Sequence, residues 1–348
     1  VIRTGGSEVL ETGFVYSTEQ NPEVDPSCSI LADDDFSSVL TGLSANTTYY
    51  ARPYARNSHG TSYGKEVTFT TLEAPEVVDL SLSGTANCYL VKKSGDYKFK
   101  AVQGNSTTTV GVPATASVLW ESFGTAAAPN AGEIIESASY EDGYVIFSTP
   151  SCFNDGNAVI AVKDASGQIL WSWHIWCCSE GFVEQSYSND AGIMMDRNLG
   201  ATSALSSDGT KTFGLLYQWG RKDPFLPGTA SSQEWPAPDL NMDDTKATIE
   251  YSVQNPMNFM TIKSSYGKEW FYSGSNHCDI TRWSGNAKTI YDPCPEGWKV
   301  PDGNFMKKAG FAENGYSRPD LSDGFYLPTD ICPEGAWFPM AGYIYGYH

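Results

Sequence analysis

The run from Thr48 to Arg56 constrains the fold most, because its side chains alternate in character with a period of two. The two sets are Tyr49, Ala51, Pro53 and Ala55, and Tyr50, Arg52, Tyr54 and Arg56. This period marks a β-strand with one buried face, and we expect the first set to point inward. Turn residues at 57–60 and the β-prone run Val67–Thr71 predict a return strand. Residues 1–72 are therefore predicted to form a small β-module.

A second all-β pattern occupies residues 73–180. Candidate strands are Asn87–Val91, Tyr97–Val102, Ala116–Trp120, Tyr144–Thr149, Ala158–Lys163 and Ile169–Cys177. The last of these carries Trp171 and Trp173 on one face and Trp176 on the other. A strand with apolar side chains on both faces is typical of the interior of packed sheets. The sequence therefore predicts a β-sandwich in this region.

The sequence pattern changes after Gly181: long periodic runs end, and glycine, tryptophan and irregular polar stretches take their place. Short strands are predicted at Met194–Leu199 and Leu215–Trp219, and a turn or two of helix at Met306–Phe311. Residues 181–348 are expected to form an irregular α+β domain. The predicted fold class is thus mainly β and multidomain, with three domains at 1–72, 73–180 and 181–348.

The first module resembles a fibronectin type III module through the string L-x-x-x-T-x-Y, followed by A-x-N. The matching residues are Leu43, Thr47, Tyr49, Ala55 and Asn57. The resemblance implies a tyrosine corner, in which the hydroxyl of Tyr49 bonds to the backbone upstream. Such a sandwich has seven strands, and about five fit between residues 1 and 71. We therefore expect the module to be N-terminally truncated.

The remainder resembles the Fibrobacter succinogenes major paralogous domain and related Bacteroides surface lipoproteins. The matching segments, in order, are TANCYLV (85–91), LWSWHIW (170–176), MDRNLGA (195–201), GLLYQWGRKDPF (214–225) and YDPCPEGWKVP (291–301). The resemblance implies a C-type lectin-like fold for residues 181–348. It also implies a lipid-anchored protein on the extracellular face of the outer membrane, with fimbrial tip or stalk subunits among the relatives. It carries over no catalytic residues.

Charge excludes two classes of partner. The chain has 22 basic and 41 acidic side chains, a net charge of −19. Nucleic-acid binding depends on basic side chains that displace phosphate counterions, and an anionic membrane surface is disfavoured for the same reason. No apolar run reaches the roughly 18 residues that a membrane span needs, so no transmembrane segment is predicted.

Eight cysteines occur without a C-x-x-C pair, which favours neither a zinc site nor a thioredoxin-like site. The hairpin around residues 164–168 brings Cys177 and Cys178 back toward Cys152. We therefore predict a disulfide between Cys152 and either Cys177 or Cys178. Cys294 and Cys332 form a second candidate pair.

Catalytic patterns are weak. Gly60–Gly64 satisfies G-x-S-x-G, but the predicted elements around it are strands, whereas a nucleophile elbow needs a following helix. His174 lies between tryptophans on a strand and is interpreted as a packed structural residue. Acidic runs at Asp33–Asp35 and Asp243–Asp244 depart from the calcium-loop pattern and are interpreted as solvated loops, with calcium as the alternative. We predict no enzyme activity, no cofactor and no metal.

Large aromatics gather among Gly, Ser, Asn and Asp in one stretch without a strand or helix period. Its candidate ligand-binding residues are Trp270, Tyr272, His277, Arg282 and Trp283. A sugar ring stacks on such aromatics while neighbouring polar side chains bond its hydroxyls. The alternative is a loop anchored by buried aromatics.

Together these features predict a non-enzymatic, adhesin-like or fimbria-associated binding protein of the cell surface. Its expected partners are a glycan or a surface protein of host or bacterium, and possibly fimbrial subunits. The rival hypothesis is an accessory or catalytic component of a surface polysaccharide-degrading system. A glycan array combined with a hydrolysis assay separates the two.

Overall fold

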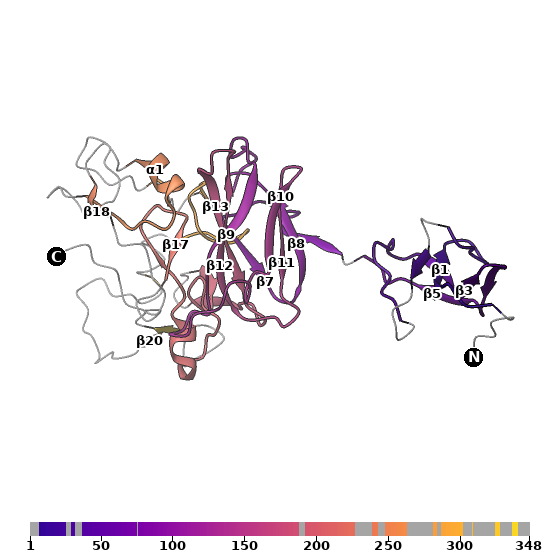
Figure 1. Cartoon of the computed structure of the whole chain (residues 1–348). Helices are drawn as coiled ribbons and strands as arrows, with labels where there is room; N and C mark the ends of the chain where they lie inside the picture. The colour runs from indigo at the N-terminus through magenta and orange to yellow at the C-terminus, as the bar shows by residue number, and fades with distance from the viewer. Residues whose placement is uncertain are drawn as a thin grey trace. The chain divides into compact units, whose positions relative to one another are not determined.

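The computed structural model describes most of the chain (Figure 1). The described residues are 7–25, 29–31, 37–74, 76–187, 192–226, 239–242, 248–262, 281–283, 287–301, 308, 324–327 and 336–339. They are mainly β-strands arranged in several sheets, which confirms the predicted fold class. By its internal contacts the chain divides into two compact units, Val1–Glu76 and Val77–His348.

The first unit contains one five-stranded sheet. Its strands are β1 (Glu11–Ser17), β2 (Ser29–Leu31), β3 (Thr48–Asn57), β4 (Gly60–Tyr63) and β5 (Val67–Thr70). The order is β2-β1-β3-β4, and β5 also pairs with β3, so β3 is central. The hydroxyl of Tyr49 accepts a hydrogen bond of 3.0 Å from the backbone N–H of Ser44. The upstream contact expected for this tyrosine is therefore present.

The predicted alternation of β3 is wrong at two positions. Pro53, expected inside, is exposed, whereas Tyr54, expected outside, is only 4% exposed. Tyr54 donates a hydrogen bond to the carboxylate of Glu11 on β1. On the same side of the strand, Arg52 donates to the backbone oxygens of Asn21 and Pro22. Tyr54 and Arg52, both expected to point outward, are therefore covered. The side chain of Glu11 lies against Tyr54, and the chain at residues 21–22 lies against Arg52.

The second unit contains the predicted β-sandwich, built from two four-stranded sheets. One has the order β10-β11-β8-β6, and the other β7-β13-β12-β9. The bounds are β6 (Val77–Asp79), β7 (Cys88–Val91), β8 (Gly95–Lys100), β9 (Thr115–Ser122), β10 (Ser137–Glu141), β11 (Tyr144–Thr149), β12 (Gly156–Lys163) and β13 (Ile169–Cys177). The sequence predicted six of these strands and missed the short β6 and β10.

The core between the two sheets is aromatic. Phe99 on β8 packs edge-on against Trp173 on β13, with ring centroids 5.2 Å apart, and also stacks on Tyr89. Phe147 on β11 completes this layer. Aromatic pairs add stability beyond the area that they bury, so this layer holds the sheets together.

The opposite face of β13 is buried as well, as the sequence predicted for this strand. Trp176 packs there with Cys88, Cys178 and Met195. Asn87, just before β7, fixes the covering segment, because its amide nitrogen donates to the backbone oxygens of Ile290 and Asp292 at 2.7 and 2.8 Å. The described residues that follow Gly181 therefore pack as a second layer over the sandwich.

This layer consists of short elements. They are β14 (Glu184–Tyr187), β15 (Gly192–Met195), a 3-10 helix (Ser206–Thr212), β16 (Leu216–Tyr217), β17 (Pro224–Phe225), β18 (Asp239–Met242), α1 (Ile249–Gln254), β19 (Met260–Ile262), β20 (Gly324–Leu327) and β21 (Ala336–Pro339). The strands predicted at 194–199 and 215–219 are present in shortened form. The helix predicted at Met306–Phe311 lies outside the described residues.

Limited proteolysis is expected to cut the chain beside Leu72 before it cuts at the predicted 180/181 boundary. Leu72 is 89% exposed, and Glu73 and Glu76 beside it are exposed as well. Gly181, by contrast, is buried and bonded to Cys178, so a cut at the predicted 180/181 boundary is not expected. Digestion with a glutamate-specific protease followed by mass spectrometry checks this. An early cut beside Gly181 would show that the covering layer opens independently of the sandwich.

Candidate ligand-binding site

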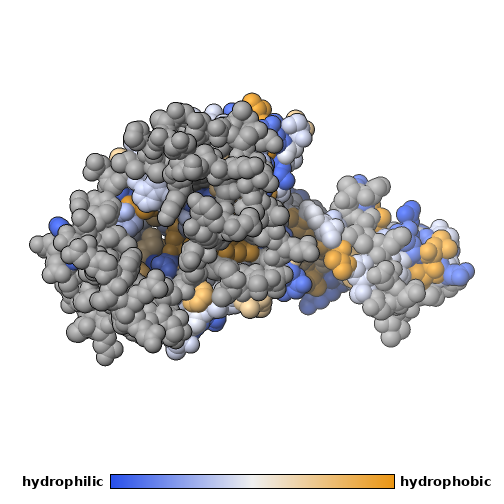
Figure 2. All heavy atoms as spheres, turned by 90° about the vertical axis from the view of Figure 1, so that its left-hand side faces the viewer, coloured by the Kyte–Doolittle hydropathy of each residue, from blue (hydrophilic) through white to orange (hydrophobic). Residues whose placement is uncertain are grey.

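Figure 2 views the second unit from the side of its covering layer, where some of the described residues in view are hydrophobic. A ligand site needs a concave surface with side chains whose polar or aromatic groups are available. Three hollows and one buried polar cluster meet part of this requirement. The available groups differ between them.

The buried polar cluster lies between β13 and the covering layer. The Lys222 ammonium is 2.7 Å from the Ser172 hydroxyl and 2.5 Å from a carboxylate oxygen of Asp223, to which Ser172 also donates. A serine beside a lysine is one arrangement for nucleophilic catalysis. Here all three side chains are buried and bonded to one another, and Ser172 lines none of the three hollows. The cluster is therefore a structural ion pair that anchors residues 222–223 to β13.

The same face of β13 carries His174. It is 1% exposed, and its Nε2 lies 2.8 Å from the amide oxygen of Asn157, whose amide nitrogen donates to the backbone oxygen of Gly200. Burial lowers the pKa of His174 to about 3. His174 is therefore neutral at neutral pH. The interpretation of this histidine as a packed structural residue is confirmed.

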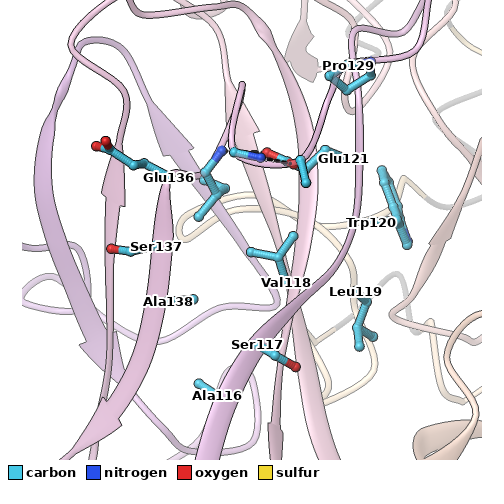
Figure 3. Close-up of a pocket in the computed structure, with 13 residues that line it drawn as sticks. Ala116, Ser117, Val118, Leu119, Trp120, Glu121, Pro129, Glu136, Ser137 and Ala138 are labelled. Atoms are coloured by element: carbon cyan, nitrogen blue, oxygen red, sulfur yellow. Dashed lines mark hydrogen bonds between the residues drawn. The ribbon is translucent and has the colours of Figure 1, made fainter.

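The first hollow is a groove of about 550 Å³ at the open edge of the sandwich, between β9 and β10 (Figure 3). Ala116 and Val118 line one side and Ala138 the other. The carboxylate of Glu121 is fully engaged, because it accepts the backbone N–H groups of Gly132, Ile134 and Ile135. Glu121 thus holds the loop before β10 in place.

The second hollow, of about 420 Å³, is polar and lies beside the 3-10 helix. Asp155 accepts both the backbone N–H and the hydroxyl of Ser179, and Asn154 donates to the backbone oxygen of Glu133. Asp155 thus ties the end of β13 to the loop before β12, and Asn154 ties that loop to the one before β10. Both side chains serve the fold.

The third hollow, of about 480 Å³, has mainly apolar walls. Tyr217 on β16, Trp283 and Trp298 contribute aromatic rings, and Phe338 on β21 a further one. Next to it stands Trp219, which is 46% exposed. Its ring meets that of Trp283 edge-on, with centroids 5.0 Å apart. We call Trp219 and Trp283 the tryptophan pair.

Several contacts fix the geometry of the tryptophan pair. The indole nitrogen of Trp283 donates to the backbone oxygen of Tyr291 at 2.8 Å. The turn that presents Trp219 is held by Gln218, which bonds the backbone of Met260 through both its amide nitrogen and its amide oxygen. Gly220 closes this turn with φ of +77°, and an added Cβ would lie 2.5 Å from Arg282. A side chain there would displace Arg282, so glycine is required.

The predicted site residues are only partly brought together. Trp283 is half-buried beside the hollow, whereas Arg282 is 3% exposed and so lies beneath the surface. Trp270, Tyr272 and His277 lie outside the described residues, as do both acidic runs. Sequence reasoning missed Trp219 and Tyr217. Their signal was the segment 215–219, where an apolar strand runs directly into a turn with a tryptophan.

The predicted disulfide between Cys152 and Cys177 or Cys178 is not formed. All three are free thiols: Cys152 is exposed on a loop, Cys177 lies in the sandwich core, and Cys178 lies on the opposite face of the strand's end. The hairpin does return the chain, but β12 pairs Gly156 with Cys177, so the strand carries Cys177 into the core. Cys294 is also a free thiol, and Cys332 lies outside the described residues.

Among the described residues, no group of three or more His, Cys, Asp or Glu side chains is placed to hold a metal ion. Within the same part of the chain, no helix has the length and apolar character needed to cross a membrane.

No family model and no curated protein matches the sequence. One similar solved structure is the SGBP-B protein of the mixed-linkage glucan utilization locus of Bacteroides ovatus, in complex with a mixed-linkage heptasaccharide. The identity is 12% and the TM-score 0.15. The similarity covers 48% of this chain and 37% of that one, so it spans well under half of the neighbour's length.

Proposed function

We propose that this chain is a non-catalytic glycan-binding protein of the bacterial cell surface. The observation that carries the proposal is the tryptophan pair, in which Trp219 stands 46% exposed against Trp283. Large aromatic side chains are normally buried, and an exposed one held rigidly marks a binding surface. A sugar ring has an apolar C–H face that stacks on such a ring.

The rigidity of the pair supports this assignment. Gln218 and Gly220 fix the turn that carries Trp219, and a hydrogen bond fixes Trp283. A preorganised surface loses little conformational entropy on binding. The net charge of −19 favours neutral or basic ligands over polyanions.

Display on the extracellular face of the outer membrane through a lipid anchor, and incorporation into a fimbria as a tip or stalk subunit, belong to the same proposal. They rest on the sequence segments that resemble surface proteins of this kind. A host or bacterial surface protein that carries the glycan would be the partner. Catalysis as part of a polysaccharide-degrading system is the rival, and the burial of the Ser172–Lys222–Asp223 cluster argues against its use as a nucleophile.

A glycan array with the intact chain, followed by calorimetric titration of the bound glycans, tests the function. Trp219→Ala is expected to weaken binding at least about thirtyfold, as the loss of a central aromatic contact does. Its melting temperature should change little, because a half-exposed side chain contributes little packing.

Tyr144→Ala is the matched control. Tyr144 is a half-buried aromatic residue on β11, in the sandwich sheet β10-β11-β8-β6, and does not belong to the tryptophan pair. It should leave glycan affinity unchanged. Unchanged affinity of Trp219→Ala would contradict the proposed site, and release of reducing ends from the bound glycans would favour the catalytic rival.

A further inference from the structure

The first hollow runs along the edges of two strands and not over the face of one. It is lined by the consecutive residues 116–121, which belong to β9, and 135–138, which lead into β10. Side chains on one face of a strand occupy every second position, so a wall of consecutive residues is a strand edge. Within the described part of the chain, β9 pairs only with β12 and β10 only with β11. The hollow therefore separates two unpaired edges.

The core of the sandwich reaches the surface at this hollow. Ala116 and Val118 on β9 and Ala138 on β10 are half-buried, and all three pack against the core between the two sheets. Val118 and Ala138 lie on facing strands (Figure 3). These side chains are short, and the described residues leave a space of about 550 Å³ beside them. Apolar side chains of an added strand would complete the core there.

Of the two edges, that of β10 is the better template for a further strand. An unpaired edge presents backbone N–H and C=O groups, and many proteins protect such an edge with lysine, proline or a bulge. β9 has a bulge at Leu119, where its register against β12 shifts. β10 has the sequence SASYE and pairs with β11 in one regular register over all five residues. Its outer edge thus has none of these three protections.

The groove is also formed before anything binds. Glu121 holds the loop before β10 through the backbone N–H groups of Gly132, Ile134 and Ile135. Ile135, which is 2% exposed, is therefore fixed in the wall. A binding surface that is already ordered loses little conformational entropy when it is occupied.

The charge of the groove indicates which kind of segment it binds. Its lining contains Glu121 and Glu136 but neither lysine nor arginine. The Glu121 carboxylate is engaged by the loop, whereas Glu136 is exposed and forms no ion pair within the described part of the chain. A second copy of the chain would bring the same carboxylates and a further net charge of −19. Charge complementarity therefore favours a basic partner over self-association.

We infer that this groove binds an extended segment of a different protein, which pairs with β10 as an additional strand. The segment carries branched apolar side chains at alternate positions, which enter between the two sheets, and a lysine or arginine that faces Glu136. About five residues make the pairing, because β10 is five residues long. The groove shares no residue with the tryptophan pair, so this inference is independent of the proposed glycan function.

Two peptides of identical composition test the alternation. The peptide acetyl-GKVTVKVTG-amide has valine at every second position of its centre, and acetyl-GKTTVVVKG-amide does not. Fluorescence anisotropy with the intact chain should show saturable binding of one alternating peptide per chain and at least about tenfold weaker binding of the rearranged peptide. Hydrogen exchange should show that the alternating peptide protects backbone amides in residues 115–141 and leaves β6 and β7, at the opposite edges of the sandwich, unchanged.

Backbone methylation separates strand addition from simple hydrophobic binding, and it needs no protein variant. The N–H groups of successive residues in a strand point to opposite edges. One peptide is N-methylated at its three valines, and the other at its two threonines and second lysine. Exactly one of the two should lose at least about tenfold in affinity, because only one set of N–H groups faces β10. A segment that binds through its side chains alone would respond to both patterns alike.

Glu136→Lys tests the charge. The unmodified protein should prefer the lysine peptide over acetyl-GEVTVEVTG-amide by about threefold, and Glu136→Lys should reverse this preference. Glu184→Lys is the matched control, because Glu184 is exposed on β14, outside the groove, and the substitution changes the net charge equally. It should keep the original preference.

Absence of saturable binding, equal binding of the two methylated peptides, or protection outside residues 115–141 would overturn the inference. Sedimentation of the unmodified protein should show a monomer, and a dimer that the alternating peptide dissociates would assign the groove to a second copy instead. None of these results would touch the glycan function, which the array measures with Trp219→Ala.

Discussion

Asn87→Ala is expected to destabilise the second unit by about 3–6 kcal/mol, because three buried polar groups lose their partner at once. The amide of Asn87 holds the backbone oxygens of Ile290 and Asp292, and its oxygen accepts the indole N–H of Trp171 at 3.0 Å. Asn87 itself is 1% exposed, so water does not replace the lost bonds. Urea unfolding followed by tryptophan fluorescence measures the change.

Asn130→Ala is the matched control, because Asn130 is exposed and bonds only to Glu133 nearby in the chain. Its expected effect is below about 1 kcal/mol. Equal effects of the two substitutions would show that residues 287–301 are not held to the sandwich through Asn87.

Acidification from pH 7 to pH 4 is expected to remove about 3 kcal/mol of stability through His174 alone. Burial lowers its pKa in the folded protein to about 3, against about 6.5 in the unfolded chain. Between these two values the unfolded state binds the additional proton, so stability falls as the pH falls. Above pH 6.5 both states are neutral and the contribution is flat.

His174→Gln isolates this contribution, because glutamine keeps an amide near Asn157 but does not titrate. The variant is expected to start less stable at pH 7 and to lose about 3 kcal/mol less on acidification than the unmodified protein. His59→Gln, at an exposed histidine of the first unit, is the control for a substitution outside the second unit. An identical pH slope in His174→Gln would mean that His174 is accessible to protons in the folded state.

The strands of the sandwich could be predicted because their signal is local. Residues such as Trp171, Trp173 and Ile175 repeat with a period of two, and the structure places all three in one core. The missed strands β6 and β10 are short, and their side chains are largely exposed, so burial leaves little pattern in their sequence. In β3 the pattern misled, because Tyr54 is covered by groups from β1 that no local rule contains.

The candidate site could not be predicted to the same extent. Trp219 and Trp283 meet only through the packing of two distant segments, and their exposure depends on that packing. For Arg282 the error runs the other way. Its polar neighbours in the sequence suggested an accessible side chain, but the turn at Gly220 lies directly against it and buries it. Among the described residues the buried hydroxyl of Tyr217 has no hydrogen-bond partner, and this has no signature in the sequence, since most buried tyrosines find a partner.

The burial of both faces of β13 makes this strand the shared wall of two layers that would otherwise melt separately. Trp173 packs in the sandwich core and Trp176 against the covering layer, although only two residues separate them on the strand. Local opening of either layer would expose one face of β13 to solvent. Its hydrogen bonds to β12 and β7 would then be less protected from water. We therefore expect the sandwich and the covering layer to unfold together, and the backbone amides of β13 to be among the slowest of the second unit to exchange with solvent.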